Sequence, residues 1–264
     1  MHPQYSLPAL LIDPHCPPER IAWLSRALNQ VNSAIGHLAG LELHLLPQRL
    51  ELKAVNDPAL PGSLWVDFLA PAFRRRYRQP HQELIVQASK IRGCPAPVVV
   101  DATAGLGRDG FLLAAAGYQV QMMERNPVVA VLLQDGLARA TANPETARIC
   151  QRIQLTVGDA KDCLAAVAAP PDVIYLDPMF PGRTKSAKVK LELQLLQRVA
   201  MPTEDNENLF RLTLSLRPKK VVVKRPLKES FLMDLRPSYT LKGKAVRFDV
   251  YQPATMGKAM SLVD

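Results

Sequence analysis

The second half of the chain alternates strand-like apolar runs with helix-length segments, and this feature constrains the fold most strongly. Such alternation is typical of a parallel α/β sheet. A last pair of runs has no helix-length gap between its members, which predicts an antiparallel hairpin at the sheet edge. The expected strands are 97–101, 118–124, 152–157, 172–177, 219–224, 238–242 and 245–251, with helices near 108–116, 127–141, 160–168 and 204–216. We therefore expect an α/β fold with about seven mostly parallel strands.

Residues 1–95 lack this alternation and indicate a smaller α+β region. Helical spacing of apolar residues from Ile21 to Val31 predicts a helix. Period-two alternation on both sides of Pro47-Gln48 predicts a hairpin. A strand from Leu64 to Leu69 and a short helix at about 82–92 complete the region. We divide the chain into 1–95, with substrate recognition as a hypothesis, and 96–264 as the main domain.

Composition excludes several classes of protein. The chain has 264 residues, 48 % of them hydrophobic and 22 % charged, so it can bury a core and is neither disordered nor collagen-like. Four cysteines without a Cys-x-x-Cys pair, together with five histidines, give no metal-ligand spacing, so no metal is expected. No apolar run reaches the roughly 20 residues that span a bilayer, and the N-terminus lacks a signal peptide pattern. These features predict a cytoplasmic protein, and the net charge of +9 is compatible with a polyanionic partner.

A glycine-rich segment follows the first strand of the predicted sheet. Gly105, Gly107 and Gly110 satisfy G-x-G-x-x-G between a strand and a helix, the context in which this pattern binds nucleotides. Glu124 ends the next strand, where a carboxylate can accept hydrogen bonds from both hydroxyls of an adenosine ribose. Together these residues predict a nucleotide-containing ligand, either a nicotinamide dinucleotide or S-adenosylmethionine.

Asp101 separates these two ligands. Its carboxylate, four residues before the first glycine, would repel a pyrophosphate but suits the ammonium group of a methionine moiety. Arg108 and Asp109 could add charged contacts to the same zwitterion. Asp159 follows the third strand, where an acid could hold the adenine amino group or cap the following helix. The sequence therefore favours S-adenosylmethionine.

The segment Asp177-Pro178-Met179-Phe180-Pro181 follows the fourth strand of the sheet. Open α/β sheets bind ligands at this carboxyl edge. Asp177 and the Pro178 carbonyl can both accept hydrogen bonds from an exocyclic amino group, and Phe180 can stack on a base. Two such acceptors would orient an amine nitrogen toward a sulfonium methyl group. We predict Asp177, Pro178 and Phe180 as catalytic residues.

These motifs resemble those of class I S-adenosylmethionine-dependent methyltransferases, which have a Rossmann-like fold. The segments DATAGLGRDG, MERNPVVAVLLQDGLARA and YLDPMFPGRTKSAKVK are similar to the RsmJ family of bacterial 16S ribosomal RNA guanine-N2 methyltransferases, densely from about 98 to 251. The resemblance implies S-adenosylmethionine as the methyl donor and 16S ribosomal RNA or the small ribosomal subunit as the partner. It implies donor contacts from Arg108, Asp109, Glu124, Arg125, Asp159, Ala160 and Asp177. The glycine-rich segment and the acid at the end of the first strand add Asp101, Gly105 and Gly107 as predicted donor contacts.

Three basic clusters are candidate RNA contacts. One follows the Asp177 motif directly, one flanks the fifth strand, and one is interleaved with aromatic residues. Contacts of this kind to phosphates make binding fall steeply with salt. The predicted RNA-binding residues are Arg183, Lys185, Lys188, Lys190, Arg74, Arg75, Arg76 and Lys224.

Three alternatives stay open at this point. The same acid, proline and aromatic residues could serve adenine N6 or a protein amide, which are also planar nitrogens. A non-catalytic RNA-binding ribosome-assembly factor would need no acceptors that face the methyl group, so Asp177 and Pro178 speak against it. A dehydrogenase is disfavoured by Asp101 and by the lack of a following substrate domain.

Overall fold

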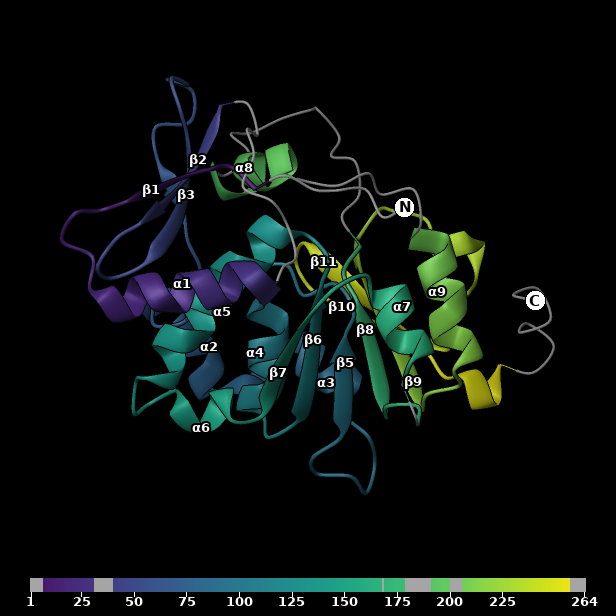
Figure 1. The fold of residues 1–264 in the computed structure, drawn as a ribbon. Helices are drawn as coiled ribbons and strands as arrows, with labels where there is room; N and C mark the ends of the chain where they lie inside the picture. The colour runs from purple at the N-terminus through teal and green to yellow at the C-terminus, as the bar shows by residue number, and fades with distance from the viewer. Residues whose placement is uncertain (1–6, 31–39, 168, 179–190, 200–205, 257–264) are drawn as a thin grey trace.

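The computed structural model describes residues 7–30, 40–167, 169–178, 191–199 and 206–256 (Figure 1). Its larger sheet has seven strands in the order β10-β11-β9-β8-β5-β6-β7. These strands are β5 (Val98–Asp101), β6 (Gln119–Glu124), β7 (Ile153–Val157), β8 (Val173–Leu176), β9 (Lys220–Pro226), β10 (Tyr239–Lys242) and β11 (Val246–Tyr251). The first five pair in parallel, and β11 pairs antiparallel with both β9 and β10. The predicted α/β fold and its final hairpin are confirmed.

Helices cover both faces of this sheet, α4 and α5 on one side and α7 and α9 on the other (Figure 1). The α-helices described from residue 84 onward are α3 (Leu84–Ser89), α4 (Arg108–Ala115), α5 (Pro127–Thr141), α6 (Ala147–Cys150), α7 (Ala160–Ala165), α8 (Leu191–Val199) and α9 (Asn206–Ser215). Successive strand residues point to opposite faces, so the strands feed two apolar clusters. Val99 and Val222 belong to the cluster with α4 and α5, whereas Val100 and Val221 belong to the cluster with α7 and α9.

The N-terminal region forms a four-stranded sheet in the order β1-β2-β3-β4. Its elements are β1 (Ala9–Ile12), α1 (Pro18–Gln30), β2 (Leu41–Leu45), β3 (Leu50–Ala54), β4 (Ser63–Leu64), α2 (Pro71–Arg78) and the 3₁₀ turn η1 (Pro80–Gln82). The predicted hairpin is confirmed as β2 and β3, closed by a hydrogen bond from Leu46 N to Arg49 O. Two further 3₁₀ turns, η2 (Leu232–Asp234) and η3 (Pro253–Thr255), lie near the C-terminus.

The predicted strand from Leu64 to Leu69 is wrong beyond its first residue. The alternation of apolar and polar residues in this segment arises because its apolar side chains are buried against helices. Val66 packs tightly against Gly136 of α5, and the Phe68 ring stacks on Phe111 of α4 at 4.4 Å. The predicted helix at 82–92 is also shorter, because η1 precedes it and α3 ends at Ser89.

One hydrophobic core crosses the boundary that the sequence predicts at residue 95. Phe68, Phe73 and Tyr77 lie before this boundary, and their rings lie 4.4–5.6 Å from that of Phe111, which lies after it. The small sheet contributes its leucines to the same cluster. The N-terminal region is therefore packed on the α4 and α5 face of the main sheet. In the described ranges, no helix is long and apolar enough to cross a membrane.

Candidate active site

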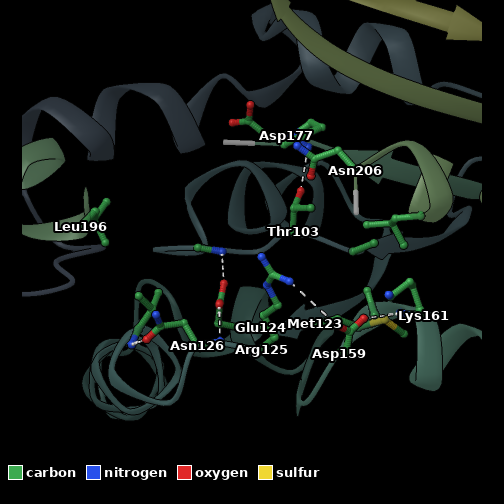
Figure 2. A pocket seen from close by; sticks show the side chains of 16 residues that line it. Thr103, Met123, Glu124, Arg125, Asn126, Asp159, Lys161, Asp177, Leu196 and Asn206 are labelled. Carbon is green, nitrogen blue, oxygen red and sulfur yellow. Dashed lines mark hydrogen bonds and ion pairs between the residues drawn. The ribbon is translucent and has the colours of Figure 1, made fainter. Parts of the chain in front are cut away.

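The loops that follow β5, β6, β7 and β8 meet at the carboxyl edge of the sheet and enclose a pocket (Figure 2). Its volume is about 900 Å³, including space that is open to solvent. The lining residues are Ala102, Thr103, Gly105, Met123, Glu124, Arg125, Asn126, Val129, Asp159, Ala160, Lys161, Asp177, Pro178, Leu196, Asn206 and Leu209. Seven of these were predicted as site residues: Gly105, Glu124, Arg125, Asp159, Ala160, Asp177 and Pro178.

Gly105 and Glu124 form the floor of the pocket. Gly105 has φ of +55°. Among the described residues other than its two chain neighbours, the only atom within 4 Å of a Cβ placed there would be Thr103 O at 3.9 Å, so the space beside its backbone is open. The Glu124 carboxylate accepts hydrogen bonds from Gly105 N and Asn126 N, each at 2.7 Å. Each carboxylate oxygen has a second lone pair. Glu124 can therefore still accept from the hydroxyls of a ligand.

Burial raises the pKa of Glu124, although its bonds to the Asn126 and Gly105 amides oppose the shift. A buried carboxylate that is held by two amides has a fixed orientation. This is the arrangement that a ribose-binding acid requires at the end of the second strand of such a sheet.

Arg125 and Asp159 lie next to each other in the pocket lining, with Nη1 3.9 Å from Oδ2 (Figure 2). Asp159 is also the N-cap of α7, since its side chain accepts a hydrogen bond from Lys161 N at 2.9 Å. The capping role and the ligand-facing role that the sequence offered are thus compatible in one residue.

Asp177 and Pro178 lie on the opposite side of the pocket, after β8. The Asp177 amide donates a hydrogen bond to Thr103 Oγ1 at 2.6 Å, which ties this loop to the one after β5 (Figure 2). The Asp177 side chain is 40 % exposed, and its Oδ2 accepts a hydrogen bond from Lys224 Nζ at 2.9 Å. Burial and the Asp109 carboxylate raise the pKa of Asp177, whereas Lys224 lowers it.

Four predicted donor-contact residues do not line this pocket: Asp101, Gly107, Arg108 and Asp109. Asp101 is only 1 % exposed, and burial and Asp109 raise its pKa well above the ordinary value. Gly107 is a packing residue, because a Cβ there would lie 2.5 Å from Leu133 Cδ1. Asp109 accepts hydrogen bonds from Tyr175 Oη at 2.6 Å and Lys224 Nζ at 2.7 Å.

The predicted catalytic residue Phe180 lies outside the described residues. The same holds for the basic cluster after the Asp177 motif, Arg183, Lys185, Lys188 and Lys190.

The arginine cluster of α2 is placed differently from the prediction of an aromatic-interleaved RNA surface. Phe73 and Tyr77 are buried in the core, so they cannot stack on bases. Arg74 pairs with Glu145, and Arg76 donates two hydrogen bonds to Glu83. Arg75, also predicted as an RNA contact, is exposed. The interleaving arises because α2 is amphipathic, with aromatic residues on its inner face.

Lys224 was predicted as an RNA contact, and the structure places it elsewhere. Its ammonium group pairs with Asp109, which does not line the pocket, and with Asp177, which does. A cation already engaged by two carboxylates is a poor partner for a phosphate, so this geometry disfavours Lys224 as an RNA contact.

Sequence reasoning missed the other nine lining residues: Ala102, Thr103, Met123, Asn126, Val129, Lys161, Leu196, Asn206 and Leu209. Asn126 carries a local signal that could have identified it, since it precedes Pro127 and caps α5 by accepting from Val128 N and Val129 N. Leu196, Asn206 and Leu209 come from α8 and α9, and only the tertiary fold brings them to the pocket. Across the described residues, no group of three or more metal-ligating side chains is present.

Comparison with known proteins agrees with this geometry. The chain matches the SAM_MT family model, described as a SAM-dependent methyltransferase, over residues 28–253. Ribosomal RNA small subunit methyltransferase J of Aeromonas hydrophila is 43 % identical over 250 residues, covering 94 % of this chain and 98 % of that protein. The protein of the same name from Aeromonas salmonicida is 45 % identical over 213 residues, covering 80 % and 85 %. The crystal structure of a SAM-dependent methyltransferase from Neisseria gonorrhoeae has a TM-score of 0.73 at 32 % identity, covering 96 % and 98 % of the chains.

A mostly parallel seven-stranded sheet with an antiparallel final hairpin, and a pocket beyond its carboxyl ends, defines an S-adenosylmethionine-dependent methyltransferase. The chain is an enzyme of this class, and S-adenosylmethionine is its methyl donor. Within the class, it belongs to the family of ribosomal RNA small subunit methyltransferase J.

Proposed function

We propose that this enzyme transfers a methyl group from S-adenosylmethionine to N2 of a guanine in 16S ribosomal RNA. The names of its relatives support small-subunit ribosomal RNA as the substrate. The observation that carries the choice of an exocyclic amine is the position of Asp177 on the pocket wall opposite Glu124 (Figure 2), with Pro178 next to it in the lining. A substrate of this kind implies a cytoplasmic enzyme that acts on free RNA or on the small subunit.

The pocket fits the donor. The open space beside Gly105 suits a ligand that passes close to the backbone. Glu124 would accept from the ribose hydroxyls, and Asp159 with the Ala160 backbone would hold the adenine at the start of α7. Arg125 would lie against the same part of the donor. Asp177, which also lines the pocket, would face its sulfonium end.

The donor supplies an activated methyl group: its carbon bonds to the acceptor nitrogen as the carbon–sulfur bond breaks, the electron pair stays on sulfur, and the surplus proton of the nitrogen leaves to solvent. The protein therefore has mainly to position the acceptor and exclude water, a contribution of about 7–11 kcal/mol in well-oriented reactions. Asp177 and the Pro178 carbonyl would accept both hydrogens of the amine. They would favour the pyramidal nitrogen and disperse its developing positive charge.

Adenine N6 and a protein amide are the alternative acceptors, because Asp177 and Pro178 could receive either. A test offers labelled S-adenosylmethionine with small ribosomal subunits, free 16S ribosomal RNA and total bacterial protein as separate substrates. Digestion of the product should give label in N2-methylguanosine. Label in N6-methyladenosine or in protein would overturn the acceptor, and the absence of label in all three would favour a non-catalytic assembly factor.

The role of Asp177 is tested by Asp177→Ala. We expect a loss of transfer of at least about 100-fold, the usual size for one lost group of this kind. Asp172→Asn is a matched control, because Asp172 precedes the other end of β8 and pairs with Lys219. It should transfer at the wild-type rate. Wild-type transfer by Asp177→Ala would rule out the proposed role.

Three further assignments are proposals on sequence grounds. Phe180 would stack on the target base, and the basic residues of 183–190 would contact RNA phosphates beside the site. Residues 1–95 would contribute to substrate recognition.

A further inference from the structure

Lys224 links Asp177, in the loop after β8, to Asp109, at the start of α4. It lies on β9, one residue beyond the last register pair of β8 and β9, Leu176 and Val223. Its Nζ donates to Asp177 Oδ2 at 2.9 Å and to Asp109 Oδ2 at 2.7 Å. Asp109 stands in the first turn of α4, directly after the glycine-rich loop. One ammonium group thus bridges the start of α4 and the proposed amine acceptor.

The charged and polar groups around Lys224 come from β5, α4, β8 and the loop that follows β8, with Arg76 of α2 acting on Asp109. Asp101 ends β5, Asp109 begins α4, Asp177 follows β8, and the Tyr175 hydroxyl of β8 donates to Asp109. Across the sheet, Phe248 of β11 lies opposite Lys224 and carries no charge. Three carboxyl groups therefore surround Lys224, and Arg76 of α2 is a second cation that acts on one of them, Asp109.

The protonation states of the cluster follow from this crowding. Burial and Asp109 raise the pKa of Asp101 well above its usual range, which favours the neutral acid. Burial opposes the charge on Asp109, yet Lys224 and the Tyr175 hydroxyl hold the pKa of Asp109 below its usual value. Burial would also lower the pKa of Lys224, but Asp177 and Asp109 raise it.

Without Lys224, Asp177 would face the Asp109 carboxylate without the ammonium group that now bridges them. Arg76 of α2 also lowers the pKa of Asp109, but its hydrogen bonds go to Glu83. Like charges in a shared site disfavour ionisation and push the groups apart. The Asp177 carboxylate would then both take up a proton more readily and leave the orientation that Lys224 imposes on Oδ2. Each change weakens an acceptor that must be anionic and fixed.

We propose that Lys224 is a positioning residue for methyl transfer: it holds the Asp177 carboxylate ionised and oriented toward the acceptor amine by anchoring it to Asp109 on α4. This proposal rests on the proposed function in its assignment of Asp177 as the amine acceptor. It gives Lys224 no contact of its own with donor or base.

The kinetic test compares Lys224→Met with Lys224→Arg. For Lys224→Met we expect kcat to fall about 100-fold, the cost of a small misplacement of a reacting group, with the RNA KM within about threefold of wild type. The acid limb of the kcat–pH profile should move up by about one pH unit or more, because an opposite charge at this distance lowers a carboxyl pKa by that amount. Lys224→Arg keeps the charge and should restore the position of this limb.

The matched control is Lys220→Met on the same strand. Lys220 is buried, and its Nζ donates to Ala88 O, Lys90 O and Tyr239 Oη, none of which belongs to a residue that lines the pocket. Its loss should lower stability while leaving the acid limb in place. If Lys224→Met loses activity while the acid limb of its kcat–pH profile stays at the wild-type position, as expected for Lys220→Met, then Lys224 has only a structural role and the proposal is wrong.

A second measurement does not depend on catalysis. Carbon NMR of aspartate-labelled protein, with the Asp177 signal assigned by its absence in Asp177→Asn, gives the Asp177 titration midpoint directly. We expect this midpoint to be higher in Lys224→Met, or in Lys224→Gln if the methionine variant does not fold, than in wild type. An unchanged midpoint would overturn the inference even if the enzyme methylates guanine. If the midpoint is raised but the enzyme methylates another acceptor, the inference about Lys224 holds and only the proposed substrate is overturned.

Discussion

At the residue scale, Gly107 is constrained more tightly than the glycine pattern suggests. Its φ is +74°, and an added Cβ would overlap Leu133 Cδ1 at 2.5 Å. Gly117 has φ of +96°, but no atom of the described residues beyond its chain neighbours lies within 4 Å of such a Cβ. We expect Gly107→Ala to lower the free energy of unfolding by about 2–4 kcal/mol, since backbone strain and overpacking add. Gly117→Ala should cost about 1 kcal/mol from strain alone. Urea unfolding followed by circular dichroism measures both, and equal losses would contradict the role of the Leu133 contact.

Residues at strand ends were predictable, because parallel strands deliver their last residues to one edge. Glu124, Asp159 and Asp177 follow that rule and line the pocket. Asp101 follows the same rule yet lies behind the pocket wall, since its carboxylate lies against Gly110 of α4. A one-dimensional pattern places a residue at the edge of a sheet but does not give the direction of its side chain.

At the element scale, β3 has a charged residue inside the small sheet. Glu51 is 1 % exposed and bonds Arg49, Lys53 and, from β4, Ser63, at 2.8–3.0 Å. Burial alone would raise the pKa of Glu51, but Lys53 and Arg49 lower it below its ordinary value. A carboxyl pKa that is lower in the folded state adds stability above the unfolded pKa, and this contribution is lost as pH falls through the folded pKa.

Glu51→Gln should therefore reduce the free energy of unfolding by about 1–3 kcal/mol at neutral pH. The difference from wild type should shrink as the pH is lowered below 4.5, the ordinary value for a glutamate, because wild-type Glu51 then becomes neutral as well. Glu42→Gln on β2, which loses one partly exposed contact to His44, should cost less than about 0.5 kcal/mol. Urea titrations at several pH values measure both, and a pH-independent loss in Glu51→Gln would contradict the ion-pair argument.

Elements with long buried runs were predictable to within one or two residues. The strand expected at 219–224 is β9, and the helix expected at 127–141 is α5 with the same bounds. By contrast, β1 is four residues long, and it becomes a strand only by pairing in parallel with β2 across α1. The helix α2 was missed because its run of arginines lacks an apolar stripe of usual length. Short elements depend on tertiary partners that a local pattern does not contain.

At the scale of the whole molecule, the shared aromatic cluster argues that the chain unfolds as one unit. Phe111 is fully buried between the rings of Phe68, Phe73 and Tyr77, so the main sheet and the N-terminal region lose the same contacts together. The predicted boundary at residue 95 would then separate two functions rather than two folding domains.

The two tryptophans make this testable, because Trp23 and Trp65 both lie before residue 95 and the chain has no others. In urea, tryptophan fluorescence should report the N-terminal region and far-ultraviolet circular dichroism the whole chain, and the two transitions should coincide. Phe111→Ala should lower the free energy of unfolding by about 3–5 kcal/mol in both signals. Phe210→Ala, equally buried in the cluster on the opposite face of the sheet, should also shift both signals, because a single cooperative unit transmits the loss. A tryptophan transition that stays in place in Phe210→Ala while the dichroism transition moves would show that residues 1–95 fold independently.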